Sequence, residues 1–492
     1  MQARSFADAA EWHGRFWLPS NPSRTVWGVL TFSPQSGSKL VLSESLIIPP
    51  GTRLNEELNL LSDPPELPLI VGESDEGYVS LTDCHVRRVK GQRTNTSGPE
   101  IITVHQILDG VALNSVDEKV FSRIASSFEG LSAWYGTEAV EINHSDRLVR
   151  FADDYPQLEA RWGDYVIMIS IDTNVQVRAR PARTETTAVQ QAVLTIEAKT
   201  PRSFTDLSRV AWTIRRLLSL AAARELAPLS ETLIWYEMPT DDQGQEYPDA
   251  SRPLPQAASL LHQPLTIADF DRDSSKDAWL FRQQVSFSEL IPRWFEMMET
   301  LDVTVNLLIR NWGLQDQMIE GGINRLSAAA DALSNVIPVA QPKFNVDDWD
   351  AFKKTILNQI DPSTVDPVML AELKERFPGV GIGYKTRVQA LAERLGEEAA
   401  LALVGDSSKW AKFVASSRNQ VAHALRRGGK LSLEQMFAIE RTLAAVVALN
   451  LMKELGFDEQ HLTSLAKQAP AFNSARFLQR QHLAITSVAP QT

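Results

Sequence analysis

The spacing of hydrophobic positions changes character about halfway along the chain. From about Arg15 to Ile234, short runs rich in Val, Ile, Leu and Trp are separated by Gly, Pro, Ser or Asn, a pattern typical of a β-sandwich or barrel. The runs are Thr25 to Phe32, Lys39 to Ile48, Leu67 to Val71, Tyr78 to Lys90, Ile101 to Leu108, Phe121 to Tyr135, Tyr165 to Ile171 and Ala192 to Lys199. One helix interrupts them, because apolar residues from Leu207 to Ala221 repeat at helical spacing after Ser203 and Thr205 as candidate caps.

From about Ser274 the pattern becomes helical and stays so. Helices are predicted over Phe287 to Trp312, Gln315 to Val336, Val346 to Ile360, Pro367 to Phe377, Lys385 to Leu395, Ser408 to Arg426 and Leu433 to Leu455. The last of these begins with Ser432 and Gln435 at capping-box spacing and ends at Gly456. The glycines from Gly379 to Gly383 follow no strand, so they indicate a break between two helices rather than a nucleotide-binding loop.

These patterns predict an α+β chain, in which an N-terminal β-rich, sandwich- or barrel-like region precedes a C-terminal all-helical bundle. The stretch from Asp241 to Leu265 is rich in Asp, Gln and Pro and has no clear period, as in a linker or surface loop. The expected domains are a β-rich region over 1–240, a linker over 241–273, a helical domain over 274–460 and a loosely ordered tail over 461–492. A chain of 492 residues is long enough for two or three domains.

Charge and cysteine content narrow the range of partners. The net charge of −12 argues against a general nucleic-acid coat or an anionic membrane surface as partner. Cys84 is the single cysteine, so no intrachain disulfide can form, which fits a reducing cytoplasm. The N-terminus has no apolar signal region, and no stretch reaches the roughly 18 uninterrupted apolar residues of a membrane span. We therefore expect a cytoplasmic protein with no membrane partner.

The clearest candidate for chemistry is the run from Arg418 through Asn419 to His423. It lies in a local reversal of charge, because residues 409–430 carry cations and no carboxylate. The cations are Lys409, Lys412, Arg418, Arg426, Arg427 and Lys430. On an ideal helix Asn419 and His423 share a face, and Arg418 lies about 140° from His423 but has a side chain long enough to fold back. Apolar residues at helical spacing form a buried stripe on the same helix: Trp410, Phe413, Val414, Val421, Ala424 and Leu425.

These residue types fit metal-free RNA cleavage. Cutting RNA through its own 2′-hydroxyl needs a base, an acid and a positive charge that stabilises the developing phosphorane, and histidine and arginine supply them. His423 is the candidate acid or base, Arg418 the charge, and Asn419 the residue that orients the histidine or donates to phosphate. Lys409, Lys412, Arg426 and Arg427 are candidate RNA-backbone contacts. A single histidine where two proton carriers are useful indicates that two copies of the site meet across a dimer.

Other interpretations of the same residues stay open. An arginine five positions before a histidine is a common pattern, and Arg426 and Arg427 before two glycines also suit a helix C-terminus. Glu197 and Lys199 have the spacing of metal-dependent nucleases, but a solvent-facing pair at a strand end is favoured. The histidines form no HExxH motif and no thiolate zinc site is possible, so neither a metal nor another cofactor is expected. The tryptophans, including Trp12, Trp17 and Trp27, are expected to fill cores.

Two segments resemble known families. SSRNQVAHALRRGG resembles the Arg-Asn-x-x-x-His motif of HEPN domains, small helical bundles found in prokaryotic toxin and anti-phage RNases. The resemblance covers about Phe287 to Gly456 and includes INRLSAAADAL, with Asp331 where such domains often carry an acidic residue, and YKTRVQALAERL. HGRFWLPSNPSRTVWGVLTFSP followed by LPLIVGESDEGYVSLTDCHV resembles the N-terminal domain of ApeA-type abortive-infection proteins, in which a β-rich region precedes a HEPN domain.

The resemblance implies a metal-independent endoribonuclease that dimerises through its helical domain to build a composite cleft. Arg418, Asn419 and His423 match the motif, although Ala424 stands where a glycine often follows the histidine. The implied function is anti-phage abortive infection by cleavage of cellular RNA, tRNA above all, with the β-rich region responding to a phage-derived trigger. The alternatives are a non-catalytic sensor or adaptor that binds RNA or a phage product, and a scaffold whose helical half only dimerises.

Overall fold

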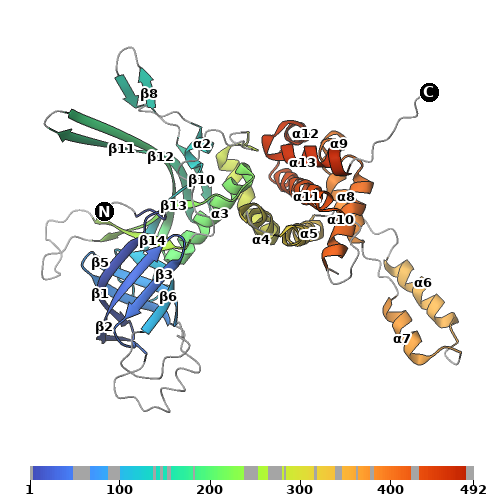
Figure 1. Cartoon of the computed structure of the whole chain (residues 1–492), viewed down its shortest axis with the longest axis horizontal. Helices are drawn as coiled ribbons and strands as arrows, with labels where there is room; N and C mark the ends of the chain where they lie inside the picture. Colours follow the sequence, from blue (N-terminus) through green and yellow to red (C-terminus); the bar gives the residue numbers. More distant parts are fainter. Residues whose placement is uncertain are drawn as a thin grey trace. The chain divides into compact units, whose positions relative to one another are not determined.

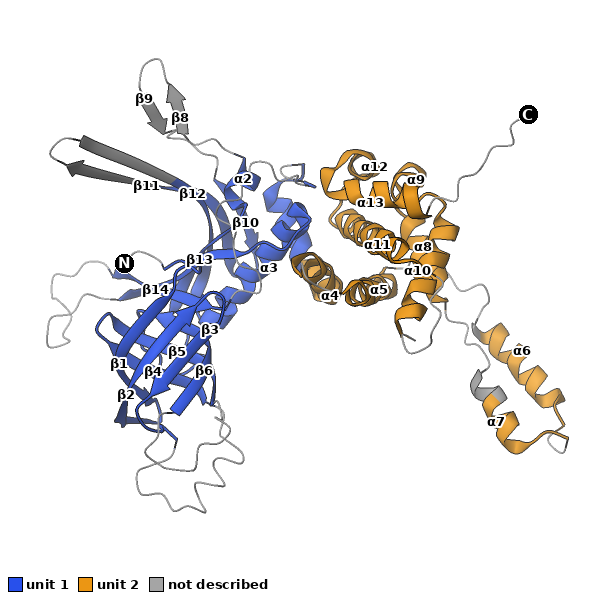
Figure 2. Cartoon of the chain, in the orientation of Figure 1, with its two compact units in different colours: residues 1–295 blue, residues 296–492 orange. Residues whose placement is uncertain are grey.

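The computed structural model divides the chain into two compact units, Met1–Phe295 and Glu296–Thr492, each described here by itself (Figures 1 and 2). The structure describes residues 4–47, 67–86, 100–136, 140–143, 148–151, 157–180, 183–237, 253–263, 280–281, 284–314, 318–337, 346–361, 364–376, 382–422 and 431–483. The β-rich first unit and helical second unit confirm the predicted α+β class.

Antiparallel strands form most of the first unit. They are β1 (Ala10–Leu18), β2 (Asn21–Ser33), β3 (Gly37–Leu42), β4 (Leu67–Ser74), β5 (Gly77–Val86), β6 (Glu100–Asp109), β7 (Phe121–Phe128), β8 (Val140–Asn143), β9 (Leu148–Phe151), β10 (Leu158–Trp162), β11 (Tyr165–Arg180), β12 (Arg183–Arg202), β13 (Pro228–Glu237) and β14 (Leu254–His262). The helices α2 (Leu131–Tyr135) and α3 (Phe204–Ala222) accompany them. Strands β8 and β9 pair with each other, and the other twelve form one sheet in the order β10-β11-β12-β7-β13-β14-β6-β3-β2-β1-β4-β5.

Six of these strands close into a barrel, because β5 at the end of the order also pairs with β6. The barrel strands alternate inward and outward side chains, and the inward ones form one apolar core that includes Trp12, Phe16 and Cys84. A Cβ atom on Gly72 of β4 would lie 2.5 Å from the ring of Phe16 on β1, so this glycine lets the ring fill the interior. The sequence pattern predicted a sandwich or a barrel, and the structure shows a barrel.

The remaining sheet joins the barrel at β6. Strands β3 and β14 pair with successive halves of one edge of β6, while β5 pairs along the opposite edge. Helix α3 packs on β7 and β12, and its apolar face is buried, as its spacing predicts. The Ser203 side chain caps the helix by accepting from the backbone N–H of Asp206.

One predicted boundary is wrong. Residues 254–262, which fall in the expected linker over 241–273, form β14 in the interior of the sheet between β13 and β6. The two neighbouring strands supply backbone hydrogen bonds, and Ala258, Leu260 and Leu261 are buried. Pairing partners elsewhere in the chain stabilise this strand, so its Pro- and Gln-containing sequence carries little local signal.

Several tryptophans fill hydrophobic cores, as predicted, but Trp27 does not. Trp12, Trp134, Trp294 and Trp410 are among the largest fully buried side chains. Trp27 is 54% exposed, so the core prediction is wrong for it.

The second unit is helical. Its elements are α4 (Phe287–Gly313, which begins in the first unit), α5 (Ile319–Val336), α6 (Val346–Gln359), α7 (Pro367–Arg376), α8 (Tyr384–Glu393), α9 (Glu397–Val404), α10 (Ser407–Ala422), α11 (Leu433–Glu454), α12 (Glu459–Gln468), η2 (Pro470–Phe472), α13 (Asn473–Leu478) and η3 (Gln479–Leu483). All seven predicted helices are present. Helix α9 was not predicted.

Helix α11 is the core of the bundle, and α5, α8, α9, α10, α12 and α13 all contact it. The capping box at Ser432 and Gln435 is present, and Gly456 adopts a left-handed φ of 92° just after the helix, as predicted. Among the described helices, α11 is the one long and apolar enough to cross a membrane, but 83% of its apolar window is buried within the protein. Its apolar composition is therefore explained by its place in the core of the helical unit.

The expected tail over 461–492 is wrong for residues 461–483. Asp458 caps α12 through the backbone N–H of His461, and Leu462 and Phe472 are buried. The Arg476 guanidinium donates to the carbonyl oxygens of Ala466 and Ala469, which fixes the turn between α12 and α13. Residues 484–492 lie outside the described part of the chain.

Candidate active site

Helix α10 carries the described part of the predicted site. It begins after Asp406, whose carboxylate accepts from the backbone N–H of Lys409 at 2.9 Å. Its buried residues are Trp410, Ala411, Val414 and Ser417, which confirms the predicted apolar stripe at Trp410 and Val414. Phe413 and Val421 are half-buried, and Ala424 and Leu425 lie outside the described residues. The Trp410 indole N–H donates to Thr442 Oγ1 of α11 at 2.9 Å, so α10 is fixed against the core helix.

Arg418 projects from α10 towards two neighbouring helices. Its guanidinium carbon lies 4.3 Å from the ring centroid of Tyr384 on α8, which is a cation–π contact. One guanidinium nitrogen lies 3.9 Å from Asp331 Oδ2 on α5. The side chain is still 41% exposed. Arg418 is therefore held in place while remaining accessible to a phosphate group.

Asp331 is shared between two arginines. Arg387 of α8 donates to its carboxylate and also to Asn335 Oδ1, at 3.1 Å. Two guanidinium groups around one carboxylate leave one positive charge in excess. Because arginine stays charged at all working pH values, this small cluster can attract and orient a phosphate oxygen.

The Tyr384 ring is neutral where it contacts the Arg418 guanidinium. Burial raises the pKa of its hydroxyl to about 12, and the nearby positive charge of Arg418 opposes this shift only in part. The phenol therefore keeps its proton at physiological pH. A neutral ring attracts a guanidinium through its face without forming an ion pair, so the arginine keeps its full charge for a substrate.

The other predicted site residues that the structure describes are exposed on α10. Asn419 and Lys412 are exposed and seven positions apart on α10, which puts them on one face of the helix. Lys409 is exposed and nine positions from Arg418, on the opposite side of α10. The structure thus does not bring Lys409 to Arg418. His423, Arg426 and Arg427 lie outside the described residues.

Gln420 has a structural role that the sequence did not reveal. Its side-chain oxygen accepts from the backbone N–H of Leu431 at 3.2 Å, and its amide nitrogen lies 3.5 Å from the carbonyl oxygen of the same residue. Gln420 thus links the end of α10 to Leu431, two residues before the start of α11. The predicted histidine lies between these two positions in the sequence, outside the described residues.

Tyr384 and Arg387 are the functional candidates that the sequence interpretation missed. They are three positions apart on α8 and so share a face. That spacing was visible in the sequence. The contact of Tyr384 with Arg418 and that of Arg387 with Asp331 depend on how α5, α8 and α10 pack together, which no local pattern specifies.

A metal-nuclease site at Glu197 and Lys199 would need a further upstream carboxylate as ligand, and Asp172, one candidate for it, does not reach Glu197. Glu197 forms an ion pair with Arg123 at 3.3 Å, and it pairs in register with Val166 of β11. Asp172 lies six residues farther along β11, opposite Gln191, which is about 20 Å away along an extended strand. Glu197 and Asp172 therefore cannot share a metal ion.

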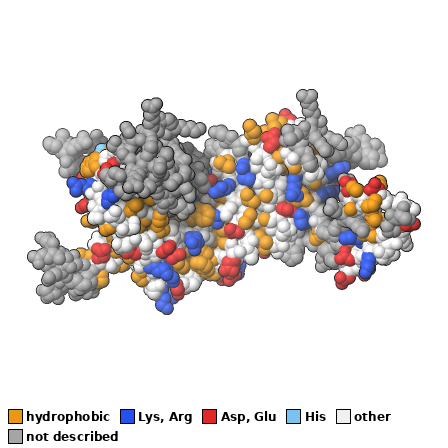
Figure 3. All heavy atoms as spheres, turned by 90° about the horizontal axis from the view of Figure 1, so that it is seen from below, with side chains coloured by type: hydrophobic (Ala, Val, Ile, Leu, Met, Phe, Trp, Pro, Cys, Tyr) orange, Lys and Arg blue, Asp and Glu red, His pale blue; other side chains and the backbone are white. Residues whose placement is uncertain are grey.

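Charged side chains are mixed on the surface. On the face shown in Figure 3, Lys and Arg are interspersed with Asp and Glu among the described residues, with no broad field of one sign. This face therefore does not have the one-sign charge that a general nucleic-acid surface would need.

Comparison with known families defines the class of protein. Residues 342–461, which include Tyr384, Arg418 and Asn419, match the family model described as Apea-like HEPN. The helical unit thus contains a HEPN domain, of a kind generally associated with RNases. Residues 11–290 match the family model described as ApeA N-terminal domain 1, which covers more than half of the chain. The chain therefore belongs to the ApeA-type family, in which this N-terminal domain precedes a HEPN domain.

The two matched regions agree with the structure. The N-terminal match extends through β14, which supports a strand rather than a linker at 254–262. Asp331 lies before the HEPN match, although its side chain contacts Arg418 within it. A comparison with curated proteins gave no match.

Proposed function

We propose that this defence-related HEPN protein is an endoribonuclease that cuts cellular RNA, tRNA in particular, by metal-independent attack of the 2′-hydroxyl. The observation that carries the proposal is the environment of Arg418. Within a matched HEPN domain, it is braced by Tyr384 and Asp331 and yet stays accessible. A preorganised positive charge of this kind stabilises the dianionic phosphorane more than the ground-state phosphate.

Each predicted residue except Lys409 has a role in this mechanism. Arg418 binds a phosphoryl oxygen, and His423 takes the 2′-hydroxyl proton or protonates the leaving 5′-oxygen. Asn419 orients the histidine or donates to phosphate. Lys412, together with Arg426 and Arg427, attracts the RNA backbone. Lys409 has no role in this mechanism, because it lies on the opposite side of α10 from Arg418.

The assembly follows from the same chemistry. One motif histidine per chain supplies one proton carrier, so two copies dimerise through the helical domain and face their motifs towards one cleft. The protein acts in the cytoplasm. The β-rich unit holds the nuclease silent until a phage-derived trigger is present.

The test is incubation of the purified full-length protein with total tRNA in EDTA. Wild type is compared with Arg418→Ala and His423→Ala, each of which should lower cleavage at least about 100-fold. The matched controls are Arg161→Ala and His13→Ala, an exposed arginine and an exposed histidine in the first unit that should leave cleavage unchanged.

Two results would oppose the proposal. Equal cleavage by wild type and His423→Ala would show that the fragments come from another activity. Folded wild type that cuts no RNA, even with extract from phage-infected cells, would favour a non-catalytic adaptor. In that case charge reversal at Arg426 and Arg427 should weaken RNA binding, whereas His423→Ala should not.

A further inference from the structure

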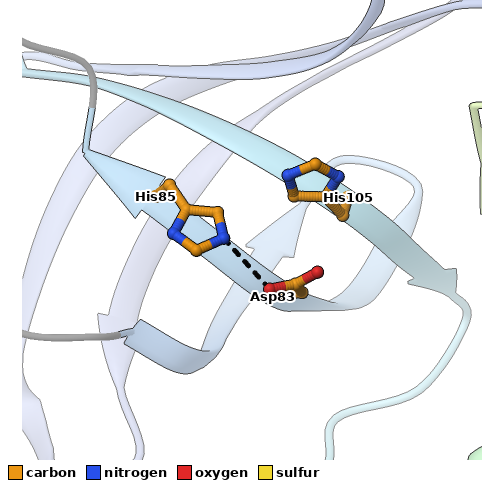
Figure 4. A group of neighbouring side chains, drawn as sticks. All are labelled: Asp83, His85 and His105. Carbon is orange, nitrogen blue, oxygen red and sulfur yellow. Dashed lines mark hydrogen bonds and ion pairs between the residues drawn. The ribbon is translucent and has the colours of Figure 1, made fainter. Parts of the chain in front are cut away.

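A second group of chemically active side chains lies on the outside of the barrel, far in sequence from the HEPN motif. In the ladder between β5 and β6, Thr82 pairs with Gln106 and Cys84 pairs with Val104. Asp83 therefore lies opposite His105. Because side chains alternate along a strand, Cys84 and Val104 point into the barrel core, and Asp83, His85 and His105 point outward together (Figure 4).

The three side chains are close enough to share an ion. His85 Nε2 lies 3.1 Å from Asp83 Oδ1, and the rings of His85 and His105 are 5.4 Å apart at 82°. One ligand atom from each residue lies within 4.8 Å of the other two. Ligands around a tetrahedral zinc ion are about 3.4 Å apart. All three side chains are exposed, so small rotations about their own bonds can close the difference.

The backbone at Asp83 supports this arrangement. Its φ is 53°, in the left-handed region that an aspartate within a strand rarely adopts. The residues on either side keep the β5–β6 register. The local departure therefore turns one residue without disturbing the barrel, and it coincides with the position whose carboxylate reaches His85. Strain that is retained at one residue often accompanies a functional site.

We propose that Asp83, His85 and His105 form a binding site for a divalent transition-metal ion of the zinc type. Two imidazoles and one carboxylate suit zinc and its neighbours in the first transition row, whereas calcium and magnesium prefer oxygen ligands alone. Three protein ligands leave at least one coordination position open to solvent. The site belongs to the first unit and does not depend on the proposed nuclease.

The test uses the full-length protein after removal of metal by a chelator and exchange into chelator-free buffer. Zinc is titrated by calorimetry, and cobalt is titrated by visible absorption, which reports direct coordination. Wild type should bind one equivalent more than the double variant His85→Ala/His105→Ala. The single variants Asp83→Asn and His105→Gln should weaken that equivalent at least about 10-fold.

His13→Ala is the matched control, because His13 is also exposed beside one carboxylate, Glu11, at 2.6 Å. It should keep the wild-type affinity and stoichiometry. Zinc should also raise the unfolding temperature of wild type but not of the double variant, while both unfold alike without metal. Equal binding by wild type and the double variant, or wild-type affinity weaker than about 1 mM, would overturn the proposal.

Discussion

At the scale of single residues, Arg418 is the main residue of the proposed active site. The sequence identified it from its motif and its basic surroundings, because those signals are local. It could not identify the contacts of Arg418, since Tyr384 and Asp331 are on other helices and are brought close only by the packing of α5, α8 and α10.

The sequence did not reveal the proposed metal site of Asp83, His85 and His105 for the same reason. No short motif contains all three residues, and only the β5–β6 register brings His105 close to the other two.

The aromatic support of Arg418 can be tested separately from its charge. Tyr384→Phe keeps the ring and should cleave RNA within about twofold of wild type, whereas Tyr384→Leu removes the cation–π contact and should lower cleavage about 10-fold. Initial rates with tRNA, compared for samples of equal folded fraction, provide the measurement. Equal activity of the two variants would show that the ring does not position Arg418.

The raised pKa of Tyr384 predicts a loss of stability in alkali. The free phenol titrates at 10.0, and burial raises its pKa in the folded protein to about 12. Between these values the unfolded chain loses its proton first, so the free energy of unfolding falls as pH rises from about 10 to 12. Tyr384→Phe should show a smaller fall than wild type in urea unfolding across this window. Parallel curves for the two proteins would contradict the assigned burial.

At the scale of elements, local signals were sufficient for most helices and for several strands. The helical repeat, the Ser203 cap and the Ser432 capping box each lie within one short segment, and the structure contains all three. Strand β14 and the segment from α12 to η3 could not be predicted in the same way. Their stability comes from neighbours that are distant in sequence, the sheet in one case and the α11 surface in the other.

Two adjacent glycines of α5 provide a matched test of helix packing. A Cβ at Gly322 would lie 3.0 Å from Glu440 Oε1, a buried carboxylate oxygen that accepts from Asn311 at 2.9 Å. A Cβ at Gly321 meets nothing closer than the flexible end of Arg325, at 3.5 Å. Alanine is favoured over glycine in helices by up to about 1 kcal/mol.

Gly321→Ala should therefore raise the free energy of unfolding, and Gly322→Ala should lower it by about 1–3 kcal/mol through crowding of α11. Chemical denaturation of both variants beside wild type measures the difference. A stabilised Gly322→Ala protein would show that α5 and α11 pack less tightly than the structure indicates.

At the scale of the whole molecule, the order of a β-rich unit and a helical unit was predictable from the change in periodicity alone. The choice of a barrel over a sandwich was not, because closure depends on one long-range pairing, that of β5 with β6. The family matches agree with this order of units. The proposed dimer belongs to this scale too, since one chain supplies one motif histidine.

Mixed dimers test the composite cleft. Wild-type and His423→Ala chains with different affinity tags are co-expressed, and the mixed dimer is purified through both tags. If each cleft needs a histidine from both copies, the mixed dimer should cleave tRNA at least about 100-fold more slowly than wild type. Half of the wild-type rate would instead show two independent sites.

The chemical nature of the new RNA ends tests the proposed attack by the 2′-hydroxyl most directly. Fragments produced in EDTA by wild type, with infected-cell extract added if a trigger is required, are analysed for their termini. Attack by the 2′-hydroxyl predicts 2′,3′-cyclic phosphate and 5′-hydroxyl ends that disappear with Arg418→Ala and with His423→Ala. Ends bearing 3′-hydroxyl and 5′-phosphate groups, or fragments that persist in both variants, would contradict this mechanism.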